Sequence, residues 1–262
     1  FWSVKPVNNQ LEYIKPYCTP AGFLDELEQN ATGKLNHENF GAGSMNRDAR
    51  TAAMANYIMN TYKPNLMTIH LITTDYAQHA TGLKSDRVSA AVGGADHAVG
   101  LILENLERNK LLDSTTVIVC GDHGFVNYNQ SIVPNVWLVQ EGLLSEKAGG
   151  EWKACFHGAG AMMFLYLKDK DDRATLNKVR KKLASLPAST RALFRIVEKE
   201  ELTAVGCDPK VALALEPIKG VAVATARTGA DIIQASGGKH GYLSGIDPTT
   251  LVAYGCGIDK KE

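Results

Sequence analysis

Apolar residues recur at intervals of three and four between residues 88 and 106, which predicts a long amphipathic helix. The apolar positions of this stretch are Val88, Val92, Ala95, Val99, Ile102, Leu103 and Leu106. A similar pattern over residues 48–61 stops before Pro64 and predicts a second helix. A third amphipathic helix, with a basic polar face, is predicted over residues 174–186.

Short apolar runs on either side of the long helix predict buried strands over residues 66–75 and 117–122. Strand, long helix and strand in this order favour a βαβ unit with a parallel sheet. Ligands bind such sheets beyond the carboxyl ends of the strands. Further strands are expected within residues 161–167, 192–202, 220–226 and 249–255. Residues 1–50 are expected to form loops with short strands, and about residues 169–235 a small side layer of a single α/β domain.

Composition excludes several classes of protein. The 262 residues are 45% hydrophobic, which is enough for a sizeable core, and the formal net charge is zero. Basic residues do not outnumber acidic ones, so the composition does not indicate a surface for nucleic acid or for anionic lipid. No apolar stretch is long enough to span a bilayer. Five widely spaced cysteines without a C-x-x-C pair argue against a disulfide framework.

Five acidic and imidazole side chains carry the candidate chemistry. Asp75 and His79 are four residues apart and would share one face of a helical turn. Asp122 and His123 follow a predicted strand, and His240 lies in the glycine-rich stretch GGKHGY. Taken singly, a strand-end aspartate often forms a turn or cap, and a histidine in a glycine loop is often only solvated. Together they are the side chains that zinc prefers, and two such ions can assist phosphoryl transfer.

The order of D-x-x-x-H, G-D-H-G and K-H-G-Y resembles the alkaline phosphatase superfamily, in particular its nucleotide pyrophosphatase/phosphodiesterase branch. The stretches that carry the resemblance are IHLITTDYAQHATG, VIVCGDHGF and GGKHGYLSG. It implies a three-layer α/β fold with a mainly parallel central sheet, here incomplete. By the same resemblance, Asp75, His79 and His240 hold one zinc ion, and Asp122 and His123 hold a second.

The resemblance also implies parts that no residue of this chain matches. The Thr or Ser nucleophile and a further aspartate of the second zinc site are expected upstream, because the chain begins with Phe1 inside the family pattern. The chain is therefore expected to be the C-terminal part of a catalytic domain, inactive by itself. An extracytoplasmic location is favoured by the resemblance alone.

The function implied is hydrolysis of a small phosphodiester, pyrophosphate or nucleotide with two zinc ions. Two alternatives remain open from the residues. One is a phosphomonoesterase or phosphonate hydrolase on the same scaffold, and the other is a catalytically inactive metal-binding fragment.

Overall fold

The computed structural model describes Leu11 and residues 15–256, and the chain divides into two compact units. The helical unit comprises the described residues up to Cys120 together with those from Thr250 onward. The sheet unit comprises Gly121–Thr249. The single domain with a side layer at about 169–235 stays a prediction.

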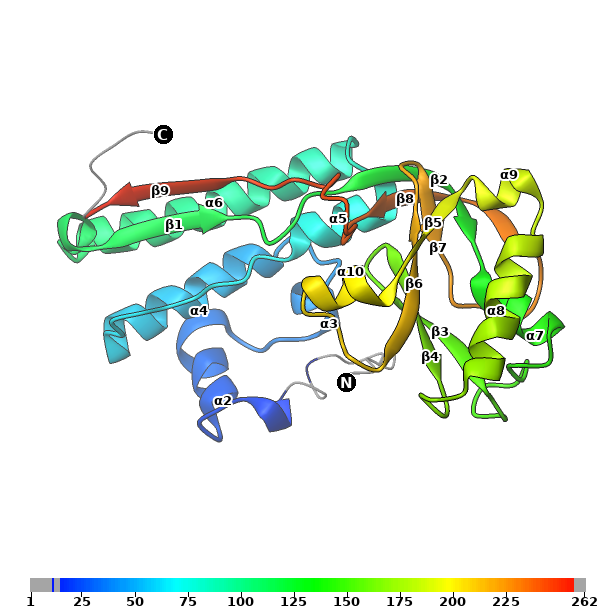
Figure 1. Ribbon diagram of the computed structural model, residues 1–262. Helices are drawn as coiled ribbons and strands as arrows, with labels where there is room; N and C mark the ends of the chain where they lie inside the picture. Colours follow the sequence, from blue (N-terminus) through cyan, green and yellow to red (C-terminus); the bar gives the residue numbers. More distant parts are fainter. Residues whose placement is uncertain (1–10, 12–14, 257–262) are drawn as a thin grey trace. The chain divides into compact units, whose positions relative to one another are not determined.

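Two long helices, α4 (Arg47–Tyr62) and α6 (Asp86–Arg108), lie side by side in the helical unit (Figure 1). Both were predicted from the apolar period, and both predictions are confirmed. Ser85 caps the start of α6, because its hydroxyl accepts a hydrogen bond from the backbone N–H of Val88. Small and branched side chains from the facing sides fill the interface, namely Ala52, Ala98, Ile102 and Leu106.

The described part of residues 1–50 consists of short helices joined by loops, so the expected loops are confirmed and the expected short strands are wrong there; residues 1–10 and 12–14 lie outside the described residues. It contains η1 (Lys15–Tyr17), α2 (Phe23–Leu27), η2 (Glu28–Thr32) and α3 (His37–Phe40). Asn36 and Asn39 cap the start of α3 reciprocally, each side chain accepting the other's backbone N–H. Asparagines that suggest a loop in sequence thus satisfy a helix terminus here.

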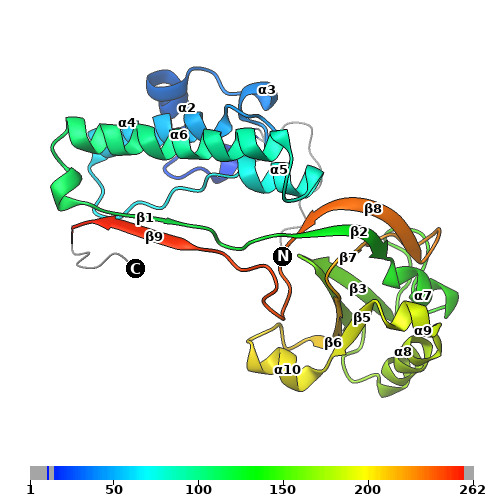
Figure 2. The ribbon, with the colours of Figure 1, turned by 90° about the horizontal axis from the view of Figure 1, so that it is seen from above.

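The predicted strand over residues 66–75 is also wrong. Residues 66–72 form no strand, and helix α5 (Thr73–Thr81) begins before Asp75. A strand exists only through its hydrogen-bonded neighbours. Among the described residues, β1 (Thr116–Cys120) pairs solely with β9 (Leu251–Gly255), in the antiparallel direction, so no βαβ unit forms (Figure 2).

Strands β1 and β9 were expected to be buried, but most of their side chains are exposed. Ile118 is 58% exposed and Leu251 is 63% exposed. The side chains of this two-stranded ribbon are mostly exposed, but Val117 is partly buried and packs against the hydrophobic cluster between α4 and α6. The turn η3 (Leu112–Ser114) connects α6 to this ribbon.

The sheet unit contains two sheets. One has the strand order β7 (Val221–Val223), β2 (Val126–Ile132), β8 (Ile232–Lys239). The other has the order β3 (Ala154–Ala159), β4 (Met162–Leu167), β6 (Val211–Pro217), β5 (Phe194–Val197). The α/β class is confirmed. The strand directions differ from the mainly parallel sheet expected, since β2–β7 is the one parallel pair between described strands.

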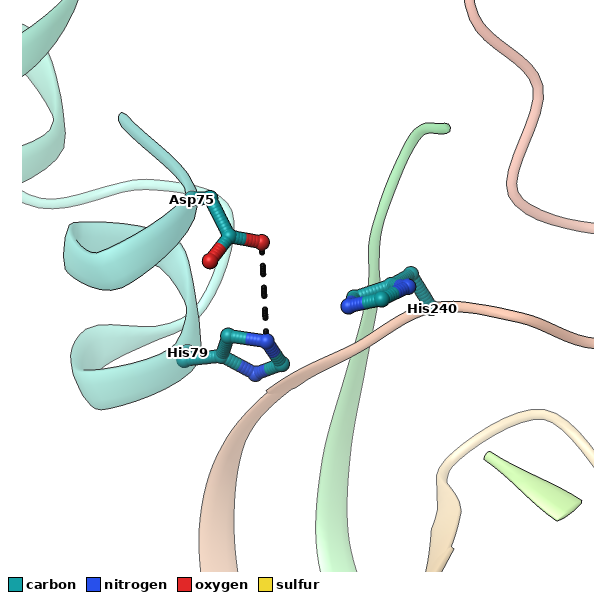
Figure 3. A group of neighbouring side chains, drawn as sticks. All are labelled: Asp75, His79 and His240. Atoms are coloured by element: carbon teal, nitrogen blue, oxygen red, sulfur yellow. Dashed lines mark ion pairs between the residues drawn. The ribbon is translucent and has the colours of Figure 1, made fainter. Parts of the chain in front are cut away.

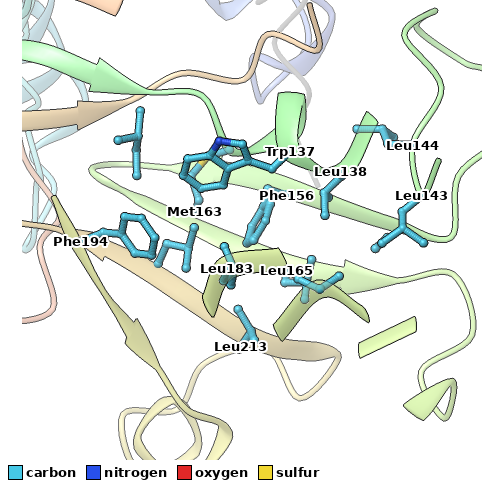
Figure 4. Packing of buried hydrophobic residues seen from close by; sticks show 14 of the residues in the cluster. Trp137, Leu138, Leu143, Leu144, Phe156, Met163, Leu165, Leu183, Phe194 and Leu213 are labelled. Atoms are coloured by element: carbon cyan, nitrogen blue, oxygen red, sulfur yellow. The ribbon is translucent and has the colours of Figure 1, made fainter. Parts of the chain in front are cut away.

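Four helices complete the sheet unit: α7 (Pro134–Gln140), α8 (Arg173–Ser185), α9 (Ala188–Arg191) and α10 (Lys199–Ala204). Helix α8 matches the predicted basic helix, and Asp172 caps it through the N–H of Thr175. Much of the core of this unit is formed by large buried side chains, among them Trp137, Phe156, Met163, Leu165 and Leu213 (Figure 4). Within the part of the chain described, no helix has both the length and the apolarity needed to cross a membrane.

Replacement of Leu213 by alanine tests this core. The side chain is fully buried, so the cavity should lower the free energy of unfolding by about 2–5 kcal/mol. The matched control is Val205→Ala, since Val205 is 57% exposed and should change stability by less than about 0.5 kcal/mol. Urea unfolding followed by circular dichroism measures both, and equal effects would contradict the packing described.

Candidate metal centre

Asp75 and His79 project from the same side of α5, one turn apart (Figure 3). The Oδ1 atom of Asp75 lies 3.5 Å from the Nε2 atom of His79, and both residues are half-buried. The predicted sharing of one helical face is confirmed, because α5 brings residues i and i+4 together. Asp75 stands in the first turn, where the helix dipole favours a carboxylate.

Asp48 fixes the start of α5 and was missed by the sequence reasoning. Its carboxylate Oδ1 accepts the backbone N–H groups of Ile72 at 3.1 Å and Thr73 at 3.4 Å. Asp48 is only 1% exposed, so these bonds are shielded from water. In sequence it resembles an ordinary acidic residue in the first turn of α4. Its contact with a segment 24 residues away is visible only in the fold.

Asp122 and His123 follow β1 in the G-D-H-G turn. The Oδ2 atom of Asp122 lies 3.5 Å from the Nε2 atom of His123, so the adjacent side chains converge. The side chain of Asp122 is 71% exposed, whereas that of His123 is 24% exposed. The imidazole is therefore held by the protein, while the carboxylate is open to solvent.

His240, also drawn in Figure 3, stacks on His123 within the sheet unit. The two imidazole centroids are 3.4 Å apart and the ring planes differ by 2°. Antiparallel pairing of β2 with β8 explains the proximity, because Val126 lies opposite Lys239. His123 precedes β2 and His240 follows β8, so both reach the same end of the ladder. Phe125 meets the two rings edge-on, at 5.4 and 5.0 Å.

The two Asp–His separations suit a metal ion. Ligand atoms at 2.0–2.2 Å from a tetrahedral zinc ion are separated by roughly 3.3–3.6 Å. The 3.5 Å separations of Asp75 from His79 and of Asp122 from His123 match this value. The donor set of imidazole nitrogen and carboxylate oxygen is also the set that zinc accepts. These residues therefore fit a zinc ion.

Burial shifts the pKa of both groups that flank His240 closely. Desolvation lowers the pKa of Lys239 from its ordinary value. Desolvation raises the pKa of Tyr242 to about 12, with the carboxylates of Asp247 and Glu216 adding to the effect. The hydroxyl group of Tyr242 donates a hydrogen bond to the backbone carbonyl of Val221. Tyr242 is thus a buried structural residue beside the histidine.

An α/β fold with carboxylate–imidazole pairs defines a candidate metal-binding protein. The chain matches the family model for Type I phosphodiesterase / nucleotide pyrophosphatase over residues 1–243. Because the match covers most of the chain, the protein belongs to this family of hydrolases, and the resemblance seen in the sequence is confirmed.

Two solved structures have a similar fold. Murine ectonucleotide pyrophosphatase / phosphodiesterase 5, solved as an inactive form in complex with AMP, has a TM-score of 0.57 at 18% identity. The human protein 5 has a TM-score of 0.54 at 14% identity. Each alignment covers 80% of this chain and 51% of the relative, so the chain spans about half the length of these structures. At such identities the likeness shows a shared α/β fold alone.

A curated relative matches over a shorter stretch. Ectonucleotide pyrophosphatase/phosphodiesterase family member 3 of Mus musculus is 34% identical over 62 residues. These are 24% of this chain and 7% of that protein.

Substitution of Asp48 by alanine tests the support of α5. The buried N–H group of Thr73 and the part-buried N–H group of Ile72 would lose their acceptor, which should lower the free energy of unfolding by about 1–3 kcal/mol. Amide hydrogen exchange should accelerate at Ile72 and Thr73. The control is Asp96→Ala on the exposed side of α6, which should leave both amides unchanged. Unchanged exchange in the Asp48 variant would show that its carboxylate does not anchor the helix.

Proposed function

We propose that the complete protein is a zinc-dependent hydrolase of small phosphodiesters, pyrophosphates or nucleotides. The observation that carries this proposal is the pair of Asp–His groups, each with the separation expected of ligands to one zinc ion. They occur in a member of the phosphodiesterase family, and their order along the chain is the one that the sequence resemblance implies. The AMP complex of the murine relative adds support for a nucleotide substrate.

In this proposal Asp75, His79 and His240 hold one zinc ion, and Asp122 and His123 contribute to a second. Bound zinc supplies positive charge that stabilises the attacking and leaving oxygens of phosphoryl transfer. Secondary structure orients the proposed ligand atoms. Helix α5 does so for the first pair, and the β2–β8 ladder does so for the histidines.

We assign the nucleophilic hydroxyl to a Thr or Ser outside these 262 residues, together with the missing aspartate of the second site. No residue of this sequence matches the family's nucleophile. Thr73 forms the first residue of α5 and is 2% exposed, which makes its hydroxyl unsuitable as a substitute. An extracytoplasmic location follows from the resemblance and stays a prediction.

Zinc binding tests the first metal site directly. His79→Ala removes one of three proposed ligands and should weaken zinc binding at least about tenfold, as measured by competition with a chromogenic chelator. His97→Ala is the matched control, because His97 is exposed on α6 and has no proposed part in metal binding. Equal zinc affinity of the two variants would refute the assignment of His79.

Activity tests the proposed division of the catalytic machinery. The 262-residue chain with added zinc should hydrolyse bis(p-nitrophenyl) phosphate at no more than about 1/1000 of the rate of a longer native product, since the chain lacks a matched nucleophile. p-Nitrophenyl phosphate and a phosphonate monoester distinguish the alternative reactions. Comparable turnover by the short chain would mean that a residue within it is the nucleophile. No turnover by the longer product on any of the three would favour the inactive metal-binding alternative.

A further inference from the structure

The segment Asp247–Thr249 lies against both turns that carry the stacked histidines. The carboxylate Oδ2 of Asp247 accepts the backbone N–H of Gly241, directly after His240, at 2.5 Å. The backbone carbonyl of the same residue accepts the N–H of Gly124, directly after His123, at 2.9 Å. Asp247 is 9% exposed, so both bonds are largely shielded from water. One residue thereby joins two turns that are more than 100 positions apart.

The glycines of the G-D-H-G turn are explained by the same segment. A Cβ atom on Gly124 would lie 2.1 Å from the carbonyl oxygen of Pro248. A Cβ atom on Gly121 would lie 2.1 Å from the Oγ1 atom of Thr249. A larger residue at position 124 would have to move the backbone of the segment, and one at position 121 would have to displace the side chain of Thr249. The two glycines therefore let residues 247–249 pack directly against the turn that presents Asp122 and His123.

A second buried carboxylate holds the middle of the loop that Asp247 closes. Glu216 on β6 is 3% exposed and accepts the backbone N–H of Ser244 at 2.7 Å. Its other oxygen accepts the Nε–H of Arg195, also at 2.7 Å. Tyr242 packs against Val126 at the start of β2. The loop from Gly241 to Asp247 is thus fixed at its start, middle and end.

We propose that Asp247 is a positioning residue that sets the placement of His240 relative to His123. Its carboxylate fixes the chain after His240, and its carbonyl fixes the chain after His123. The relevance to zinc rests on the function proposed above, whereas the bridging of the two turns does not. Outer hydrogen bonds that orient metal ligands commonly change metal affinity by about 10- to 100-fold when removed.

The two bonds of Asp247 can be separated by mutation. Asp247→Ala removes the bond to Gly241 and keeps the backbone bond to Gly124. Asp247→Asn keeps a side-chain oxygen that can accept the Gly241 N–H. The matched control is Asp208→Ala, because Asp208 also accepts a backbone N–H, that of Lys210 at 2.9 Å, but lies apart from the two histidine turns in sequence.

Amide hydrogen exchange and histidine NMR form the first readout, without metal. In the wild type, Gly241 and Gly124 should both exchange slowly. In Asp247→Ala, exchange at Gly241 should accelerate at least about tenfold while Gly124 stays protected. The ring-proton shifts of His240 should move toward unstacked values. Asp247→Asn should restore both signals, and Asp208→Ala should change neither.

Zinc affinity forms the second readout, with the zinc ion alone as the probe. Asp247→Ala should raise the Kd for zinc about tenfold, Asp247→Asn should largely restore it, and Asp208→Ala should leave it unchanged. A folded Asp247→Ala protein with wild-type Gly241 exchange, histidine shifts and zinc affinity would overturn the proposal. If that variant fails to fold, rapid Gly241 exchange in the wild type would overturn it instead. Altered exchange and shifts in a protein that binds no zinc would support the bridging role and contradict the proposed function.

Discussion

The antiparallel pairing of β2 with β8 is the constraint on which the histidine pair depends. Strands that run in opposite directions bring the residue before one strand next to the residue after the other. His123 and His240 occupy these positions, and their rings stack at 3.4 Å. A parallel pairing of the same two strands would place the histidines at opposite ends of the ladder. The relative direction of β2 and β8 therefore decides whether the two imidazole rings can lie next to each other.

Helix α5 also brings two of the proposed ligands together, but it does so through local geometry. Asp75 and His79 need only one turn of helix to converge, because positions i and i+4 lie one above the other. The helix itself needs a fixed start, and the buried carboxylate of Asp48 supplies it from α4. A pair defined by local spacing thus still depends on a contact between distant segments.

Buried carboxylates recur as supports in this protein. Asp48, Asp247 and Glu216 each accept backbone N–H groups while being at most 9% exposed. Asp122 differs from them, because its side chain is 71% exposed and suits a ligand role. A carboxylate that is shielded and hydrogen-bonded orders the chain around it, since leaving the donors unmatched costs about 1–3 kcal/mol each. The exposed one keeps its oxygens available for a cation.

The sequence by itself determined the helices α4, α6 and α8, the strands β1, β4, β5, β7 and β9, the shared face of Asp75 and His79, and the family. These depend on short-range periodicity and on the order of short motifs, which the chain carries locally. Only the tertiary structure decided that residues 66–72 form no strand and that β1 pairs antiparallel with β9. It also decided that Asp247 joins the turns of His123 and His240. Strand pairing and buried hydrogen bonds are made between segments far apart in sequence, and no local pattern specifies which segment supplies the partner.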